Sequence, residues 1–322
     1  MNYRRMGSTG LKVSALCLGT MTFGWSADKE ASFAIMDAAV DAGINFFDTA
    51  DIYSYWSAGN HGGESETLIG EWLHQRRNRR DVVVATKVRG RMWEGVNGQG
   101  LSRVHIKSAV EDSLRRLQTD YIDLYQVHYP DTETPLDETL EALDRLVCDG
   151  KVLYLGASNF PAWLLMKALW VSDAHDLARF DCIQPHYSLV HRAEYERELE
   201  AACLDQGVGV IPYSPLAAGF LTGKYTRENR TPDTSRADSG LIKQLTGDDN
   251  AYRALDAIER IADAHVVPMA QVALAWQLAR PSITSPIIGA RTVAQLEEVV
   301  GATSLELSPE QIEALDAVSA GF

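Results

Sequence analysis

The sequence predicts a protein of the α/β class that folds as a (β/α)8 barrel, also called a TIM barrel. Three observations support this prediction: eight short strand-like segments occur, helix-length amphipathic segments alternate with them, and no linker divides the 322 residues. The main alternative is an open doubly wound sheet, which normally carries a glycine-rich GxGxxG turn after its first strand. This chain has GTMTFGW at that place. We therefore expect one barrel domain over residues 1–322.

The strands are predicted from short apolar runs, several of which, such as DVVVATK and KVLYLGASN, do not alternate with polar residues. Continuous apolar runs are typical of parallel strands that are covered on both faces. In chain order, the predicted strands are Ala15–Gly19, Asn45–Thr49, Val82–Lys87, Ile122–His128, Val152–Ser158, Cys182–Tyr187, Val208–Tyr213 and Pro286–Gly289.

The helices are predicted from apolar residues that recur with helical spacing. One of them opens with proline in its first turn and ends before Gly150, and the last begins with the capping-box sequence SPEQ. In chain order, the predicted helices are Lys29–Asp41, Val104–Leu117, Pro135–Asp149, Pro161–Ala174, Ala193–Gln206, Tyr252–Ala264, Met269–Leu278, Val293–Val300 and Pro309–Ser319. The stretch Leu216–Asn250 is expected to be one long irregular loop, because it is rich in Thr, Arg, Asp and Gly.

Composition and charge limit the functions that this chain can have. Lys and Arg number 30 and Asp and Glu number 44, which gives a formal net charge of −14. Nucleic-acid binding through the phosphate backbone requires a basic face, so this balance argues against such a partner. The chain has no CxxC pair, no histidine pair at zinc spacing, no signal peptide and no run of 18 apolar residues. We therefore expect a soluble cytoplasmic protein without a metal or a membrane segment, whose oligomeric state the sequence leaves open.

Four polar side chains lie at or just beyond the ends of predicted strands: Asp48, Tyr53, Lys87 and His128. Catalytic residues of (β/α)8 barrels lie at these carboxyl ends. Lys87 ends an apolar strand and needs a carboxylate partner, for which Asp48 is available, and its charge is expected to lower the pKa of Tyr53. A histidine that donates to a carbonyl oxygen and a tyrosine that protonates it suit carbonyl reduction. Each residue alone has an ordinary structural explanation, so the prediction depends on the combination.

Six motifs of this chain resemble the ordered motifs of the aldo-keto reductases: FFDTADIY, VVATKV, LYQVHYPD, LGASNF, PYSPLAAGFLTGKY and PIIGARTVAQLEE. The resemblance extends from Tyr3 to about Ala317 and is strongest to the branch of aryl-alcohol dehydrogenases and potassium-channel β subunits. GSTGLKVSALCLGTMTFG resembles the N-terminal β-hairpin that plugs the bottom of that barrel, followed by the first strand. The remaining length is assigned to loops and to extra C-terminal helices.

The resemblance implies an NADPH-dependent reductase that converts an aldehyde or ketone to the alcohol. It implies that Tyr53 is the general acid, that Asp48 and Lys87 tune it, and that His128 orients the carbonyl. The residues implied for NADP(H) binding are Gly19, Thr20, Met21, Asp48, Ser158, Asn159, Gln184, Tyr213, Ser214, Leu216, Gly219, Leu221, Lys224, Gly289, Arg291, Gln295 and Glu298.

Within this implied cofactor site, Tyr213 matches the ring that stacks on the nicotinamide. Arg291 would face the 2′-phosphate, which indicates a preference for NADP(H). Val299 departs from the family, which often has an asparagine there that contacts the adenine, so Glu298 would hold the adenine with less help. His186 lies in QPHYS, where many relatives have QxxYN, and either borders the pocket or packs behind it.

The predicted substrate pocket has an aromatic wall, which suits the apolar or sugar face of a small carbonyl compound. Its residues are Trp25, Tyr53, Tyr55, Trp56, Trp93 and His128, with Met92 and the loop Leu216–Asn250 beside them. The alternative for each tryptophan is a place in the core. Because the chain ends soon after the last helix, we expect an open and permissive pocket.

Two other functions compete with carbonyl reduction. The first is an NADP(H)-binding, redox-sensing subunit with slow turnover, which the channel-subunit branch suggests. The second is glycoside hydrolysis by paired carboxylates, which is disfavoured because no Glu ends the fourth or seventh strand.

Overall fold

Eight parallel strands form the centre of the molecule. The computed structural model describes residues 1–232 and 239–322. The strands are β3 (Cys17–Gly19), β4 (Phe46–Asp48), β5 (Val83–Val88), β6 (Ile122–Val127), β7 (Val152–Ser158), β8 (Phe180–Gln184), β9 (Gly209–Val210) and β10 (Ile287–Gly289). Their order in the sheet is β10-β3-β4-β5-β6-β7-β8-β9. The two ends of this order, β9 and β10, are joined by main-chain hydrogen bonds from Ile287 N to Pro212 O (2.9 Å) and from Thr284 N to Val210 O (2.8 Å), which close the barrel. The predicted (β/α)8 barrel is therefore confirmed.

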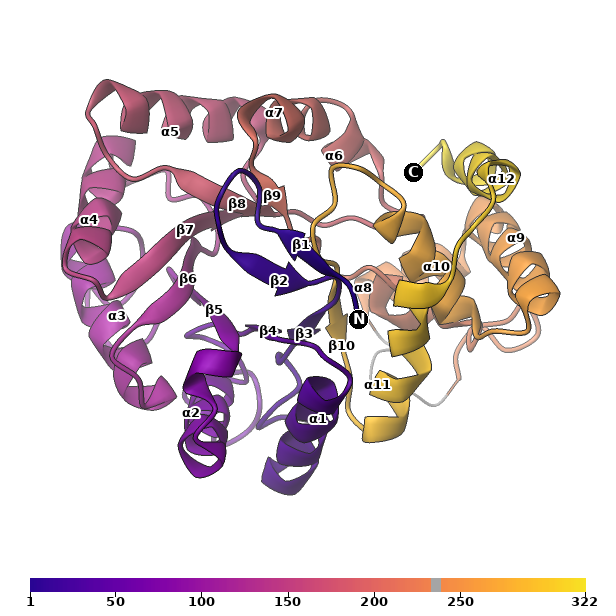
Figure 1. The fold of residues 1–322 in the computed structure, drawn as a ribbon, viewed down its shortest axis with the longest axis horizontal. Coiled ribbons are helices and arrows are strands. Elements are labelled where there is room, and N and C mark those ends of the chain that lie inside the picture. The colour runs from indigo at the N-terminus through magenta and orange to yellow at the C-terminus, as the bar shows by residue number, and fades with distance from the viewer. Residues whose placement is uncertain (233–238) are drawn as a thin grey trace.

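A β-hairpin covers one end of the barrel (Figure 1). Its strands β1 (Tyr3–Arg5) and β2 (Lys12–Ser14) pair antiparallel. The hairpin buries Met6 and Val13 fully against apolar side chains that point into the barrel from its strands. Gly7, at the turn, has φ +55°, and a Cβ there would lie 2.3 Å from Gly207 O. Only glycine allows the hairpin to approach the barrel so closely, and the predicted plug is confirmed.

Helices surround the strands on the outside of the barrel (Figure 1). They are α1 (Lys29–Asp41), α2 (Glu64–Arg76), α3 (Arg103–Leu117), α4 (Leu136–Cys148), α5 (Ala162–Ala174), α6 (Ala193–Glu196), α7 (Leu199–Gln206), α8 (Gly240–Thr246), α9 (Asp249–His265), α10 (Met269–Leu278), α11 (Val293–Val300) and α12 (Pro309–Ser319), with short 3-10 helices η1 (Arg79–Asp81), η2 (Ala217–Thr222) and η3 (Gly301–Ser304). The predicted capping box at the start of α12 is present, with Ser308 as the N-cap. Within residues 1–232 and 239–322, no helix has the length and apolar character needed to cross a membrane.

Helix α2 is absent from the sequence prediction. It begins after Gly63, which has φ +90° and offers no side-chain cap. Its buried face includes Glu66 and Gly70, so the apolar spacing that identifies a helix is interrupted there. Gly70 is needed because a Cβ at this position would lie 2.2 Å from Arg116 O on α3. Close packing of α2 against α3 thus requires glycine at a buried position, which interrupts the apolar pattern from which a helix is predicted.

Two further predictions of secondary structure are corrected. The predicted helix Ala193–Gln206 is broken into α6 and α7, because Glu198 leaves the helical conformation with φ −143°. The predicted irregular loop Leu216–Asn250 contains η2 and α8, and Ser239 caps α8 by accepting a hydrogen bond from Ile242 N. Residues 233–238 of that stretch lie outside the described residues.

Candidate active site

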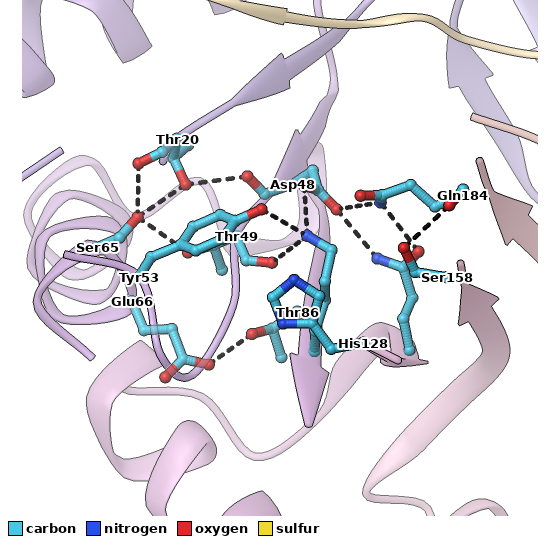
Figure 2. Close-up of polar contacts among 12 residues, drawn as sticks. Thr20, Asp48, Thr49, Tyr53, Ser65, Glu66, Thr86, His128, Ser158 and Gln184 are labelled. Carbon is cyan, nitrogen blue, oxygen red and sulfur yellow. Dashed lines mark hydrogen bonds and ion pairs between the residues drawn. The ribbon is translucent and has the colours of Figure 1, made fainter. Parts of the chain in front are cut away.

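A fully buried ion pair lies inside the barrel at the carboxyl ends of β4 and β5. Lys87 Nζ is 2.6 Å from Asp48 Oδ2, and the two side chains are 0% and 2% exposed. Nζ also donates to Thr49 O (2.8 Å) and to Tyr53 OH (3.0 Å) (Figure 2). All three ammonium protons are therefore used. Burial alone would lower the pKa of Lys87, but Asp48 and Tyr53 outweigh it and raise this pKa, so Lys87 stays charged.

Asp48 is held from its other side by two glutamines. Its Oδ1 accepts hydrogen bonds from Gln126 Nε2 (3.0 Å) and from Gln184 Nε2 (2.9 Å), and Gln184 also donates to Gln126 Oε1 (3.1 Å). The carboxylate thus accepts on both oxygens, which fixes its orientation toward Lys87. Gln184 is predicted from the sequence as a cofactor residue, and Gln126 is not among the predicted site residues. The signal for Gln126 was a polar residue within the buried strand IDLYQV, which also contains Asp123.

Tyr53 and His128 lie next to each other beside this ion pair, with ring centroids 6.0 Å apart (Figure 2). Burial raises the pKa of Tyr53 to about 12 although Lys87 acts to lower it. The sequence predicts a lowered pKa for Tyr53. The difference arises because the loss of solvent around the phenol outweighs the attraction of Lys87, and because Asp48 compensates part of the Lys87 charge. Tyr53 is therefore a phenol near neutral pH, and since its oxygen accepts from Lys87, its own proton is available for another acceptor.

His128 is a neutral imidazole in this site. Burial, together with the charges of Lys87 and Arg89, lowers its pKa to about 3. A neutral imidazole has one N–H donor and one acceptor nitrogen, so His128 can donate a hydrogen bond without carrying charge. Its backbone is tied to the neighbouring strand ends, because His128 N donates to Val88 O (3.0 Å) and Asn159 Nδ2 donates to His128 O (3.0 Å).

A second hydrogen-bonded group extends from His128 to Tyr213. Asn159, whose φ is +60°, also donates from Nδ2 to Ser158 Oγ (3.0 Å) and accepts at Oδ1 from Tyr213 OH (2.9 Å). The Tyr213 ring is stacked on His186, with centroids 5.0 Å apart and an interplanar angle of 9°. His186 therefore packs against Tyr213. Of the four residues predicted at the nicotinamide, Ser158, Asn159 and Tyr213 are joined by these hydrogen bonds, whereas the Gln184 side chain donates to Asp48.

The chain after Tyr213 forms a tight turn with several left-handed residues. Ser214, Ala217 and Ala218 all have left-handed backbone conformations, with φ of 55°, 49° and 56°. A Cβ on Gly219 would lie 2.4 Å from Lys224 Nζ. The tight turn thus brings a lysine ammonium back over the loop, and a positive charge beside compact backbone suits an anionic cofactor.

The other predicted cofactor residues are spread along the rim. Thr20 is fully buried and its hydroxyl donates to Asp48 O (3.0 Å), so it supports the barrel wall. At the end of β10, Arg291 N donates to Gln295 Oε1 (2.9 Å). The remaining members of the predicted set include Leu221, which is fully buried, and Met21, Leu216, Gly289 and Glu298, which are half-buried or exposed. Their cofactor roles stay predictions.

The predicted pocket wall contains one continuous aromatic group. Trp56 has edge contacts with Trp25 (5.7 Å), Tyr55 (5.4 Å) and Tyr53 (6.3 Å), measured between ring centroids. Trp25, Tyr55 and Trp56 are 36%, 53% and 40% exposed. Trp93 is separate from this group, because it is stacked on His105 with centroids 4.7 Å apart.

These contacts place a neutral phenol that can donate a proton beside a neutral imidazole that can donate a hydrogen bond. Comparison with known proteins identifies the family of this chain. The aldo/keto reductase family model matches residues 15–320, and the chain belongs to this family. Its members are oxidoreductases that generally use NAD(P)H to reduce carbonyl compounds.

Individual relatives cover nearly the whole chain. An oxidoreductase of Bacillus subtilis (strain 168), YrpG, is 42% identical over 326 residues, which cover 100% of this chain and 97% of the relative. Versiconal hemiacetal acetate reductase of Aspergillus parasiticus is 35% identical, covering 98% and 96%. A probable voltage-gated potassium channel subunit beta of Oryza sativa subsp. japonica is 36% identical, covering 99% and 96%. The chain is thus similar to reductases and to a channel subunit alike.

Proposed function

We propose that this protein reduces an aldehyde or ketone to the alcohol with NADPH, and that Tyr53 donates the proton. The observation that carries the proposal is the contact of Lys87 Nζ with both Asp48 Oδ2 (2.6 Å) and Tyr53 OH (3.0 Å). A bound nicotinamide would supply the hydride to the carbonyl carbon. The residues of this chain orient the carbonyl oxygen and protonate it.

Each residue has a separate task in this proposal. His128, neutral because its pKa is about 3, donates a hydrogen bond to the carbonyl oxygen. Tyr53 holds its proton until negative charge develops on that oxygen. Lys87 then stabilises the phenolate that Tyr53 becomes. Asp48, fixed by Gln126 and Gln184, keeps Lys87 in place.

Cofactor binding is assigned to the residues that follow the strands. Asn159 and Tyr213 would lie against the nicotinamide, and the loop from Ser214 to Lys224 would lie against the phosphates. Arg291 would bind the 2′-phosphate, because a guanidinium is the usual partner for that group. Changing Arg291 to Gln is therefore expected to raise the KM for NADPH about tenfold or more and to leave that for NADH nearly unchanged.

The test of the catalytic assignment is Tyr53→Phe, which removes one hydroxyl and keeps the ring. Turnover of benzaldehyde, followed by NADPH absorbance, should fall about 10²–10⁴-fold, while NADPH binding measured by fluorescence stays within a factor of about three. Tyr3→Phe is the matched control, because Tyr3 is exposed in the hairpin and its hydroxyl donates to Gly43 O. A Tyr53→Phe variant with wild-type turnover contradicts the assignment.

A second candidate function is a slow redox-sensing subunit, which the similarity to a channel subunit beta favours. The same assay separates the two functions. A binding subunit would hold NADPH and oxidise it in about one turnover with any small carbonyl compound. Repeated turnover with benzaldehyde supports the reductase.

A further inference from the structure

A half-buried arginine, Arg89, lies at the rim of the candidate active site between the ends of β5 and β6. It follows Lys87 by two residues, and its neighbour Val88 accepts a hydrogen bond from His128 N (3.0 Å). Arg89 Nε donates to Pro130 O (3.2 Å), and Pro130 follows His128 by two residues. The side chain is therefore anchored at the two strand ends that supply the proposed catalytic lysine and histidine.

The backbone of Arg89 is strained. Its φ is +130°, a conformation that glycine adopts readily and that other residues rarely adopt. The conformation is held because Arg89 O accepts a hydrogen bond from Gly100 N (3.1 Å). Strain of this kind costs about 1–3 kcal/mol and is concentrated at functional sites. A strained arginine at a site rim indicates that its side chain has a use.

Within the described residues, the guanidinium of Arg89 has no carboxylate partner. The half-buried arginines that do form ion pairs with carboxylates are Arg79, Arg116, Arg179, Arg192 and Arg280. Asp131 is close enough for Arg89 to contribute to its lowered pKa. Its carboxylate already accepts from Leu101 N, Glu133 N and Thr134 Oγ1. The charge of Arg89 is therefore not compensated by an ion pair.

The two terminal nitrogens of Arg89 suit a planar anion. Nε is occupied by Pro130 O, while Nη1 and Nη2 form no hydrogen bond within the part of the chain that the structure describes. Two parallel N–H groups match the two oxygens of a carboxylate. The charge reaches the reacting groups, because Arg89 helps to lower the pKa of His128. Lys87 attracts a substrate carboxylate less, because Asp48 cancels part of its charge.

We propose that Arg89 binds a carboxylate of the substrate, so that this enzyme acts on carbonyl compounds that also carry an acid group. The inference rests on the proposed carbonyl reduction. The exposed aromatic side chains of Tyr55 and Trp56 near Tyr53 suit an aromatic body between the two ends. Formylbenzoates combine an aldehyde, a ring and a carboxylate, and benzaldehyde is the same molecule without the acid.

The test compares kcat/KM for 2-, 3- and 4-formylbenzoate with that for benzaldehyde, at saturating NADPH. In the wild-type protein, at least one formylbenzoate is expected to exceed benzaldehyde. Arg89→Gln should lower the ratio of kcat/KM for that formylbenzoate to kcat/KM for benzaldehyde at least tenfold. Arg89→Lys should lower this ratio less, because lysine keeps the positive charge but lacks the two parallel N–H groups of the guanidinium. Arg91→Gln is the control, because Arg91 is exposed on the same loop, and it should leave the ratio unchanged. The thermal midpoint of each variant reports folding.

The outcomes separate this inference from the proposed function. If benzaldehyde is turned over but Arg89→Gln does not change the ratio of kcat/KM for the formylbenzoate to that for benzaldehyde, the role of Arg89 is overturned. Carbonyl reduction is then still supported. The role of Arg89 is overturned in the same way if no formylbenzoate exceeds benzaldehyde. If no aldehyde is turned over, the proposal of carbonyl reduction is wrong. Whether Arg89 binds a carboxylate is then tested separately, by measuring the binding of benzoate and of benzyl alcohol through tryptophan fluorescence. An anion site is supported if Arg89→Gln weakens benzoate binding at least tenfold and leaves benzyl alcohol binding unaffected. The anion site is overturned if the variant weakens the binding of both compounds equally.

Discussion

Replacing Lys87 with Met tests the central ion pair most directly. As Tyr53 gives up its proton, its oxygen becomes negative at 3.0 Å from Lys87 Nζ. Two unit charges at that distance interact by about 5.5 kcal/mol at an effective dielectric constant of about 20. Asp48, at 2.6 Å from the same ammonium, cancels part of this field. A net loss of about 3 kcal/mol, or about a hundredfold in kcat, is expected.

The assay must separate lost catalysis from lost folding. Lys87→Met leaves the Asp48 carboxylate buried without its cation, which costs about 3–5 kcal/mol of stability. The double variant Lys87→Met/Asp48→Asn removes the unpaired charge and should recover stability in urea unfolding but not turnover. Lys107→Met, an exposed change on α3, is the control. If the double variant recovers wild-type kcat, Lys87 acts only on stability and the reasoning is refuted.

Three further predictions concern Asp51, the pH dependence set by His128 and Tyr53, and Gly7 in the hairpin. Asp51 is buried and its carboxylate makes no hydrogen bond within the described residues. Burial raises its pKa from 3.8 to about 7. Ionisation of Asp51 therefore lowers the free energy of unfolding as pH rises through that window. In urea unfolding, the stability of Asp51→Asn relative to the wild-type protein should be higher at pH 8 than at pH 4 by at most about 4 kcal/mol. With pKa values of about 3 for His128 and about 12 for Tyr53, kcat/KM should be flat from about pH 5 to about pH 9, and a step near pH 6.5 contradicts a neutral His128. Gly7→Ala should destabilise the protein by about 2–4 kcal/mol in denaturant titration, because the new Cβ meets Gly207 O, and wild-type stability would show that the hairpin shifts freely.

Much of the barrel could be predicted because its signals are local. Buried parallel strands appear as short apolar runs, and the α12 start at Ser308 follows from side chains that cap the adjacent turn. Helix α2 could not be predicted, because Gly70 and Glu66 lie on its buried face for reasons that involve α3 and β5. Glu66 accepts hydrogen bonds from Arg116 Nε (2.6 Å) and Thr86 Oγ1 (2.6 Å), which are distant in sequence.

The sequence by itself determined which residues stand at the strand ends, and so it placed Asp48, Lys87, Tyr53 and His128 on one rim. It could do so because parallel strands of a closed barrel bring their carboxyl ends to the same face. The tertiary structure alone decided the protonation of Tyr53, since its pKa depends on how far the phenol is removed from solvent and on how far Asp48 cancels Lys87. The tertiary structure also showed that Gln126 orients Asp48 and that Arg89 lacks a carboxylate partner within the described residues. Burial and pairing are sums over residues far apart in the chain, so no local pattern records them.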